Sequence, residues 1–332
     1  MKALVYTNTH EVTYRDEPDP AREDGDVVLG IDAVGICGSD MHAYHGRDPR
    51  RSPPLILGHE VCGTIVEGSG VGTRVTVNPL ITCRRCHYCV TGRDNLCSNR
   101  TMIGMTRAGG FAERMSIPAA SLIAIPQDMT ARQAALTEPA ATALHAIDRA
   151  ARALARPLPE ARTLVIGGGA VGLLAALLLR SYGCRDLYVA ETNPLRRESA
   201  ARAVGCATYD PHEGGRGGPA DNSMDLVLDA VGGKSTRNSA LEAVRPGGVV
   251  VHLGLMDWAS EIDMRKLTLA EITLIGTYTY STADLNATVA ALYRGAFGDL
   301  EWVEERSLAD GATAFADLDH GRTPAAKILL RP

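Results

Sequence analysis

The sequence predicts an α/β protein made of two units, a mostly β unit and a doubly wound parallel sheet covered by helices. Two observations support this fold class. Residues 2–136 are punctuated by Gly and Pro and contain short β-branched runs, several of which alternate apolar and polar residues. From about residue 137, strand patterns alternate with helical ones, as in a parallel sheet whose strands are joined by helices. The 332 residues are 45% hydrophobic, which is enough for a large core.

The elements follow in order along the chain. In the first unit the β-branched runs 26–34, 63–68 and 73–79 are predicted strands. A helix begins near Thr137, where Pro139 fits the first helical turn and an Ala-rich stretch follows. Beyond it the sequence predicts helices at 170–183 and 194–205, and strands at 163–166, 186–191, 224–232, 249–255 and 272–280. A tail helix is expected at 283–295 and a last strand at 325–332.

Charge and hydropathy argue against two classes of function. The chain has 34 Lys plus Arg and 39 Asp plus Glu, and a net charge of −5 does not suit a nucleic-acid surface. The longest uncharged stretch, 163–179, contains four glycines and is shorter than the ~20 apolar residues of a membrane span. The N-terminus has no signal-peptide pattern. We therefore expect a cytoplasmic protein that contacts neither nucleic acid nor membrane.

A Gly-rich turn predicts a dinucleotide site. Gly167, Gly169 and Gly172 form a GxGxxG between a predicted strand and a predicted helix, and Val171 lies within it. In such a unit the first glycine permits the tight turn, the second lets the backbone approach a pyrophosphate, and the third allows close helix packing. An ordinary Gly-rich turn is the alternative, which the surrounding strand–helix–strand pattern disfavours.

An acidic residue favours NAD over NADP at this site. Glu191 ends the next predicted strand, where a carboxylate accepts both ribose hydroxyls of NAD and repels the 2′-phosphate of NADP. Arg196 and Arg197 follow closely and weaken this preference, because an Arg can accommodate that phosphate. NAD remains the expected cofactor.

A four-cysteine cluster predicts a structural zinc site. Cys83, Cys86, Cys89 and Cys97 have the spacing CxxCxxCx7C, and four thiolates held by short loops suit a closed tetrahedral zinc. An iron–sulfur cluster also takes four thiolates, but nothing else in the chain suggests electron transfer. Because a fully thiolate-coordinated ion offers no place for water or substrate, the expected role is structural.

A second set of ligand types is dispersed along the chain. Cys37, His59, Glu60 and Glu138 combine a thiol, an imidazole and carboxylates, which together make the open type of zinc site. A lone Cys or His is more often a core residue than a ligand. The combination, in a chain that also carries a dinucleotide pattern, favours a catalytic metal.

These motifs resemble the zinc-dependent medium-chain alcohol dehydrogenases nearly from end to end. The resemblance rests on GICGSDMHAYHGR, PLILGHE, the four-Cys lobe, GGFAE, TEP, GGGAVG and AAKILL. It is closest to the polyol branch, which includes sorbitol and galactitol-phosphate dehydrogenases with threonine dehydrogenases nearby, because that branch has a glutamate where this chain has Glu138. It implies a GroES-like catalytic domain of residues 1–139 and 279–332 with two zinc sites, and an inserted Rossmann NAD-binding domain of residues 140–278.

The resemblance implies a role for each ligand. Cys37, His59 and Glu60 would hold the catalytic zinc, Glu138 would be a direct or water-bridged fourth partner, and the substrate oxygen would take the open place. Zinc as a Lewis acid lowers the pKa of the bound alcohol, so that hydride can leave to the nicotinamide.

The same resemblance implies a path for the proton. Ser39 would receive it from the alcohol and His42 would pass it towards solvent. A solvated loop histidine is the alternative reading of His42. Asp40 is expected to orient a neighbouring ligand.

The expected reaction is oxidation of a secondary alcohol of a polyol or sugar derivative to its ketone, with NAD and two zinc ions per subunit. If Arg47 and Arg107 face the cleft, an anionic or phosphorylated polyol is favoured, and otherwise a neutral one. Oxidation of the L-threonine 3-dehydrogenase type is an alternative reaction, and a non-catalytic NAD(H)-binding sensor is an alternative of another class. By analogy with relatives, a homodimer or homotetramer is expected.

Overall fold

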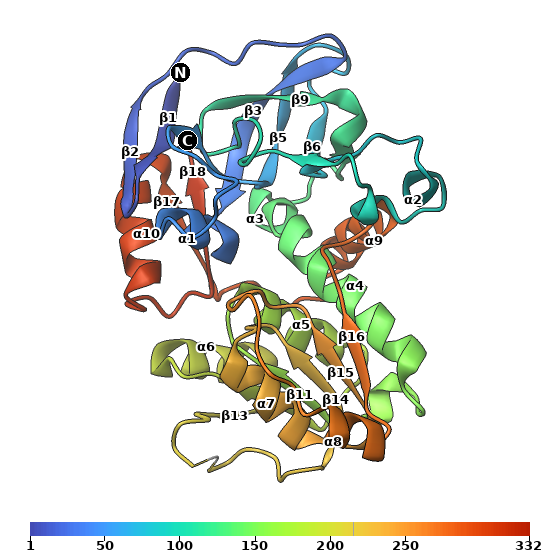
Figure 1. Cartoon of the computed structure of the whole chain (residues 1–332). Coiled ribbons are helices and arrows are strands. Elements are labelled where there is room, and N and C mark those ends of the chain that lie inside the picture. Colours follow the sequence, from blue (N-terminus) through green and yellow to red (C-terminus); the bar gives the residue numbers. More distant parts are fainter. Residues whose placement is uncertain (215) are drawn as a thin grey trace.

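The computed structural model describes residues 1–214 and 216–332, whose strands form two large sheets and two small ones. Figure 1 shows the large sheets in two domains, one above the other, with helix α4 (Thr137–Ala153) running between them. Both ends of the chain lie in the upper domain.

The upper domain is built on a sheet with the strand order β10-β6-β5-β3-β18-β17, and β9 also pairs with β3. β3 (Asp26–Gly35) is buried along nearly its whole length, so both of its faces are covered. The C-terminal strand β18 (Lys327–Arg331) pairs with it, and the end of the chain therefore returns to the first domain. The other strands are β5 (Glu60–Glu67), β6 (Arg74–Val77), β9 (Arg114–Pro118), β10 (Leu122–Ala124) and β17 (Val303–Ser307).

Two small sheets and five helices complete this part. The expected tail helix is α9 (Thr282–Tyr293), which packs against α4. α1 (Gly38–Tyr44) and α10 (Gly311–Asp319) were not predicted, because such short helices carry too few apolar residues at helical spacing. The remaining elements are β1 (Lys2–Asn8), β2 (Glu11–Asp16), β4 (Leu55–Ile56), β7 (Leu80–Ile81), β8 (Thr101–Met102), α2 (His87–Val90) and α3 (Ala131–Ala135).

The lower domain holds a sheet of parallel strands in the order β13-β12-β11-β14-β15-β16, which is the order of a Rossmann sheet. Side chains of β11 (Thr163–Ile166) alternate between two cores. Val165 packs in the core shared with α4 and α5 (Ala170–Ser181), whereas Leu164 and Ile166 pack in the core shared with α7 (Lys234–Ala243) and α8 (Met264–Leu269). Helices therefore cover both faces, and the predicted fold class is confirmed. The other elements are β12 (Leu187–Ala190), α6 (Pro194–Val204), β13 (Ala207–Tyr209), β14 (Met224–Asp229), β15 (Val244–His252) and β16 (Thr273–Gly276).

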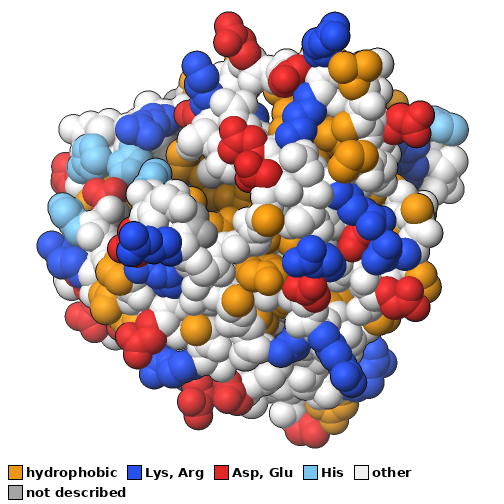
Figure 2. All heavy atoms as spheres, turned by 90° about the horizontal axis from the view of Figure 1, so that it is seen from below, with side chains coloured by type: hydrophobic (Ala, Val, Ile, Leu, Met, Phe, Trp, Pro, Cys, Tyr) orange, Lys and Arg blue, Asp and Glu red, His pale blue; other side chains and the backbone are white. Residues whose placement is uncertain are grey.

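The surface carries charges of both signs. Figure 2 shows Lys and Arg interspersed with Asp and Glu over the face seen from below. Within the part of the chain that the structure describes, no helix has the length and apolar composition needed to cross a membrane.

Candidate active site

Cys37, His59 and Glu60 come together at one end of the upper sheet. β3 and β5 are antiparallel neighbours in which Gly35 faces Glu60, so Cys37, two residues after β3, lies near His59, the residue just before β5. One ligand atom from each of the three residues lies within 4.8 Å of the others. Gly35 is required at this point, because a Cβ there would overlap the carboxylate of Glu60.

The donor set suits a zinc ion with an open position. His59 and Glu60 are buried, whereas Cys37 is only partly buried, so one side of the group can be reached. Asp40 positions Cys37 and His59. Its carboxylate accepts a hydrogen bond from the Cys37 N–H (3.0 Å), and its Oδ1 lies 3.5 Å from Nδ1 of His59. A thiol, an imidazole and a carboxylate are the ligands that open zinc sites use, and the residues present fit the ion.

The electrostatics of His59 follow from its neighbours. Burial lowers the pKa of His59, but the charges of Asp40 and Cys37 outweigh burial and raise that pKa well above its ordinary value. The imidazole therefore lies in a strongly negative environment, which also attracts a metal cation.

Lys327 is a buried partner of Glu60 that sequence reasoning did not find. Its ammonium, at the start of β18, donates to both carboxylate oxygens of Glu60 (2.6 and 2.7 Å) and to the carbonyl of Ile36 (2.7 Å). All three N–H donors of the Lys327 ammonium are thus used, and the side chain is buried. The C-terminal strand therefore supplies the positive charge that balances Glu60. The motif AAKILL was the available signal, but it did not say which carboxylate the lysine meets.

Glu138 lies near the three donors but outside their 4.8 Å group. It sits in the first turn of α4 and accepts a hydrogen bond from the hydroxyl of Tyr280 (2.5 Å), a second buried residue that the sequence did not single out. Burial raises the pKa of Glu138, which favours its neutral form. The Glu138 carboxyl is thus held beside the three donors by the hydroxyl of a buried tyrosine.

Ser39 and His42 lie three residues apart on α1, and so on the same face of that helix. Arg51 is a third residue of this group that the sequence reasoning missed. Its buried guanidinium donates to the Ser39 Oγ (3.3 Å) and carbonyl (3.1 Å) and pairs with Asp48 (2.8 Å). Burial lowers the pKa of the half-buried His42, and the positive charges around it act in the same direction.

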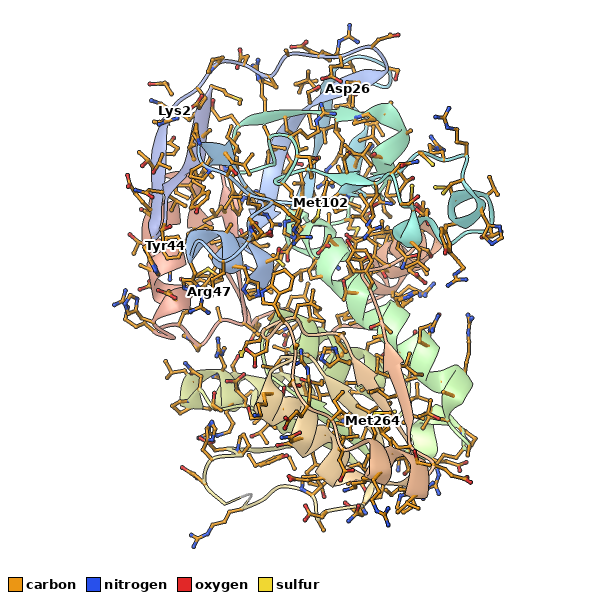
Figure 3. All side chains as sticks on the ribbon, viewed as in Figure 1. Lys2, Asp26, Tyr44, Arg47, Met102 and Met264 are labelled. Carbon is orange, nitrogen blue, oxygen red and sulfur yellow. The ribbon has the colours of Figure 1, made fainter. Side chains whose placement is uncertain are left out.

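Two arginines considered for substrate binding have different positions. Arg107 pairs with Asp26 at 2.7 Å. Asp26 starts β3, whereas Cys37 follows the end of this ten-residue strand, roughly 30 Å away at the rise of an extended strand. Of the two alternatives, the one in which Arg107 faces the cleft therefore does not apply. Arg47 is exposed just beyond α1, at the lower end of the upper domain in Figure 3.

The Gly-rich turn has the expected backbone. Gly167 adopts a left-handed φ of 98°, which a larger residue would disfavour. A Cβ at Gly172 would overlap the Gly167 carbonyl, whereas a Cβ at Gly169 would meet nothing within 4 Å, so open space lies above the second glycine. Val171 is in the first turn of α5 and is partly exposed. The helix N-terminus and the open turn offer amide groups to an anion.

Glu191 lies beneath this turn. Its Oε2 accepts a hydrogen bond from the Gly168 N–H, and its Oε1 accepts one from the Asn193 N–H, both at 2.8 Å. Arg196 also contacts Oε1 at 3.3 Å, and Arg197 donates to the Glu191 carbonyl (2.8 Å). Both arginines are thus occupied by neighbouring oxygens, and the carboxylate is fixed at the end of β12.

The four cysteines form a compact group. One sulfur from each of Cys83, Cys86, Cys89 and Cys97 lies within 4.8 Å of the others, and two of the separations are 3.5 and 3.9 Å. A tetrahedral ion with Zn–S bonds of about 2.3 Å places its sulfurs about 3.8 Å apart, so these residues fit zinc. Backbone hydrogen bonds from Arg85 and Cys86 lower the pKa of the Cys83 thiol to about 6, which favours the thiolate.

The four-Cys lobe, residues 83–97, includes α2 and projects at the edge of the upper domain (Figure 1). It contacts the segment that carries Tyr280. Asn95 donates to the Tyr278 carbonyl (2.8 Å), and Asp94 accepts hydrogen bonds from the Thr282 amide (3.1 Å) and hydroxyl (2.5 Å). The lobe therefore braces the chain on both sides of the residue that holds Glu138.

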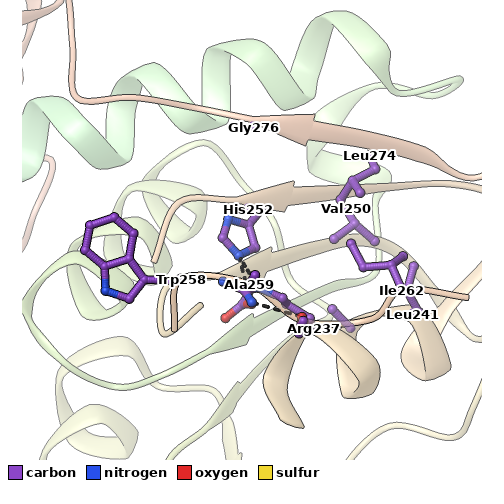
Figure 4. Close-up of a pocket in the computed structure, with 12 residues that line it drawn as sticks. Arg237, Leu241, Val250, His252, Trp258, Ala259, Ile262, Leu274 and Gly276 are labelled. Carbon is purple, nitrogen blue, oxygen red and sulfur yellow. Dashed lines mark hydrogen bonds and ion pairs between the residues drawn. The ribbon is translucent and has the colours of Figure 1, made fainter. Parts of the chain in front are cut away.

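A separate cavity of about 350 Å³ lies in the lower domain, between α7 and strands β15 and β16. Figure 4 shows Arg237 bonded to His252 (2.9 Å), with Trp258 on one side and Leu274 on the other. None of the predicted site residues lines it.

Comparisons with known proteins agree with this site. One family model, the alcohol dehydrogenase GroES-like domain, matches residues 23–127, and another, the zinc-binding dehydrogenase, matches residues 170–294. The chain is 33% identical to L-galactonate-5-dehydrogenase of Escherichia coli (strain K12) over 86% of this chain and 85% of that protein. It is 32% identical to sorbitol dehydrogenase of Bacillus subtilis (strain 168) over 85% of this chain and 83% of that protein.

A solved structure extends the match to the whole chain. The zinc-binding dehydrogenase of Sinorhizobium meliloti 1021, bound to NADP, has a TM-score of 0.86 and 28% identity, and the match covers 100% of this chain and 99% of that one. The chain therefore belongs to the zinc-type medium-chain dehydrogenases, in their polyol branch, and is an oxidoreductase that uses zinc and a nicotinamide cofactor.

Proposed function

We propose that this enzyme oxidises a secondary alcohol of a polyol or sugar derivative to the ketone, with NAD as hydride acceptor. The observation that carries the proposal is the meeting of Cys37, His59 and Glu60 at the reachable end of the upper sheet. These residues would hold the catalytic zinc, which when bound supplies the Lewis acidity that lowers the pKa of an alcohol.

The residues of α1 and its neighbours would move the proton. Ser39 accepts it while its own hydroxyl proton passes towards His42, so no net charge stays on Oγ, and the guanidinium of Arg51 donates to this oxygen and holds it in place. His42, one turn further along α1, takes the proton onward, because a lowered pKa keeps its imidazole neutral and ready to accept. Asp40 keeps His59 and Cys37 oriented meanwhile.

The proposal is tested by following NADH formation across neutral polyols, sugar acids, polyol phosphates and L-threonine. Sugar acids belong in the panel because the relative from Escherichia coli is named for L-galactonate. Arg50 and Arg51 both pair with Asp48, whereas Arg47 is exposed just beyond α1, so Arg47 is the arginine that could meet an anionic substrate. Turnover on polyols or sugar acids supports the proposal. Turnover on L-threonine alone would mean that the enzyme oxidises an amino alcohol and not a polyol. Binding of NADH without turnover on any substrate would favour a non-catalytic sensor.

We propose NAD as the cofactor because Glu191 is fixed under the Gly-rich turn and its two nearest arginines are already paired. Replacing Glu191 with Ala is expected to lower the preference for NAD over NADP by about 10-fold or more, since a buried carboxylate no longer repels the 2′-phosphate. The ratio of kcat/KM for the two cofactors measures the change. Glu198→Ala, on the exposed side of α6, is the matched control and should leave the ratio unchanged. A wild-type enzyme that prefers NADP would contradict the proposal.

For the four-Cys lobe we propose a structural zinc. The close sulfur packing and the bonds from Asn95 and Asp94 to the segment 278–282 support this role, because an ion here would fix the segment that carries Tyr280.

We propose that a second copy of the chain covers the edge of the lower sheet. Within the described residues β16 has one neighbouring strand, β15, and its other edge is free for pairing. Exposed apolar side chains lie on β16 and in the stretch of chain between β15 and β16, and so many on one segment is unusual for a monomer. They are Leu255, Met256, Trp258, Met264, Leu269 and Leu274.

Replacing Leu274 with Lys is expected to convert the oligomer to monomers, since a charge would be buried in the middle of the paired edge. Light scattering after size-exclusion chromatography measures the mass. Val71→Lys, which places the same charge on another exposed apolar position, is the control. A wild-type protein that elutes as a monomer at micromolar concentration would rule out the interface.

A further inference from the structure

A cluster of two histidines and an aspartate lies outside the catalytic group. One ligand atom from each of His10, His45 and Asp319 lies within 4.8 Å of the others. The three residues come from remote parts of the chain: the turn between β1 and β2, the residue that ends α1, and the last residue of α10. Figure 2 shows histidines gathered at the left edge of the face seen from below.

From this geometry we propose a third metal site, which binds Zn²⁺ or a similar first-row transition ion through two imidazoles and one carboxylate. This donor set is a common one for such ions, and water can fill the remaining positions because the cluster is partly exposed. His45 Nε2 and Asp319 Oδ1 are already 2.6 Å apart. An ion with bonds of about 2.1 Å would need them to separate by a fraction of an ångström and would draw His10 in.

The turn that carries His10 is fixed in place. The His10 N–H donates to the Tyr44 carbonyl (2.6 Å), and the neighbouring Thr9 packs so tightly on Gly46 that a Cβ there would lie 2.7 Å from its hydroxyl oxygen. His10 itself adopts a left-handed φ of 59°, where glycine is the usual residue of a tight hairpin turn. Holding an imidazole in that conformation aims its ring at His45, at 5.1 Å between centroids.

The electrostatics of the site also favour a cation. The C-terminal ends of α1 and α10 both lie at the cluster, and each brings the negative end of a helix dipole. The carboxylate of Asp319 adds a full negative charge. Among the described residues the imidazole of His10 donates or accepts no hydrogen bond, so it is available as a ligand, whereas His45 is held only by Asp319.

An ion here would tie the end of α1, which also carries Ser39 and His42, to the β1–β2 turn and to the returning C-terminal segment. The site is separate from the catalytic group, and its existence does not depend on the proposed reaction.

The test counts metal ions. Zinc-loaded protein is titrated with further Zn²⁺ under isothermal calorimetry, and bound metal is measured by mass spectrometry after desalting. The wild type is expected to bind one equivalent more than the His10→Ala/His45→Ala double variant. Single variants should weaken binding of that equivalent by about 10-fold or more, in the range found when metal-site partners are removed. His320→Ala is the matched control, because His320 lies beside Asp319 but bonds to the Ala316 carbonyl.

Cobalt distinguishes this site from the other two. Co²⁺ bound through thiolates gives an intense sulfur-to-metal absorption, and the other two sites both contain cysteine. Co²⁺ added to the zinc-loaded protein should therefore bind without that band. If the double variant unfolds, Asp319→Asn keeps the size of the side chain and should still weaken binding. The proposal is overturned if the wild-type protein takes up no further equivalent of metal ion. It is also overturned if the extra equivalent persists in both the His10→Ala/His45→Ala and the Asp319→Asn variants.

Discussion

Replacing Cys37 with Ala is expected to lower kcat/KM by about 1,000-fold or more, a loss of about 4 kcal/mol of transition-state stabilisation. Cys37 supplies the thiolate of the catalytic group and lies on its reachable side. Without it, His59 and Glu60 are too few to hold an ion firmly, so the zinc content should fall by one per subunit.

Kinetics and zinc analysis of the same samples measure both losses. Cys206→Ala is the matched control, since Cys206 is a single thiol packed against the core of the lower domain, and it should keep both the activity and the zinc. An active Cys37→Ala enzyme with its full zinc content would show that the ion is held elsewhere.

Replacing Lys327 with Met is expected to destabilise the metal-free protein by about 3–5 kcal/mol, the usual cost of leaving one partner of a buried ion pair unpaired. Glu60 is completely buried and has both oxygens on the Lys327 ammonium. The loss should be smaller with zinc bound, because the cation then balances the same carboxylate.

Urea unfolding of the metal-free and zinc-loaded forms measures this difference. Lys327→Met/Glu60→Gln should recover part of the stability, since a neutral amide tolerates burial better than a lone carboxylate. Lys266→Met, on the short helix α8 far along the chain, is the control for removing a lysine. Equal losses with and without zinc would mean that Glu60 does not face the ion.

The sequence predicted those parts of the molecule that local patterns determine. The Gly-rich turn, the strand β11 and the helix α5 lie within twenty residues, and backbone sterics alone require glycines there. The four cysteines likewise close a single short loop. In both cases the residues that meet are neighbours in the chain.

The partners of the site residues could not be predicted in the same way. Lys327 is 267 positions from Glu60, and Tyr280 is 142 positions from Glu138. Such pairs exist because β18 returns beside β3 and because the segment after β16 passes α4, and periodicity carries no information on which distant side chains then meet. The sequence likewise left open whether Arg107 faces the cleft, and its partner in the structure is Asp26.

The most direct test of the account is removal and return of the catalytic zinc during polyol oxidation. A chelator should remove the ion at the reachable Cys37, His59 and Glu60 group first, because the four-thiolate group is closed and holds its ion more firmly. NADH formation should disappear with the loss of one zinc per subunit and return when one equivalent is restored. Full turnover by protein that retains only the four-thiolate zinc would contradict the account.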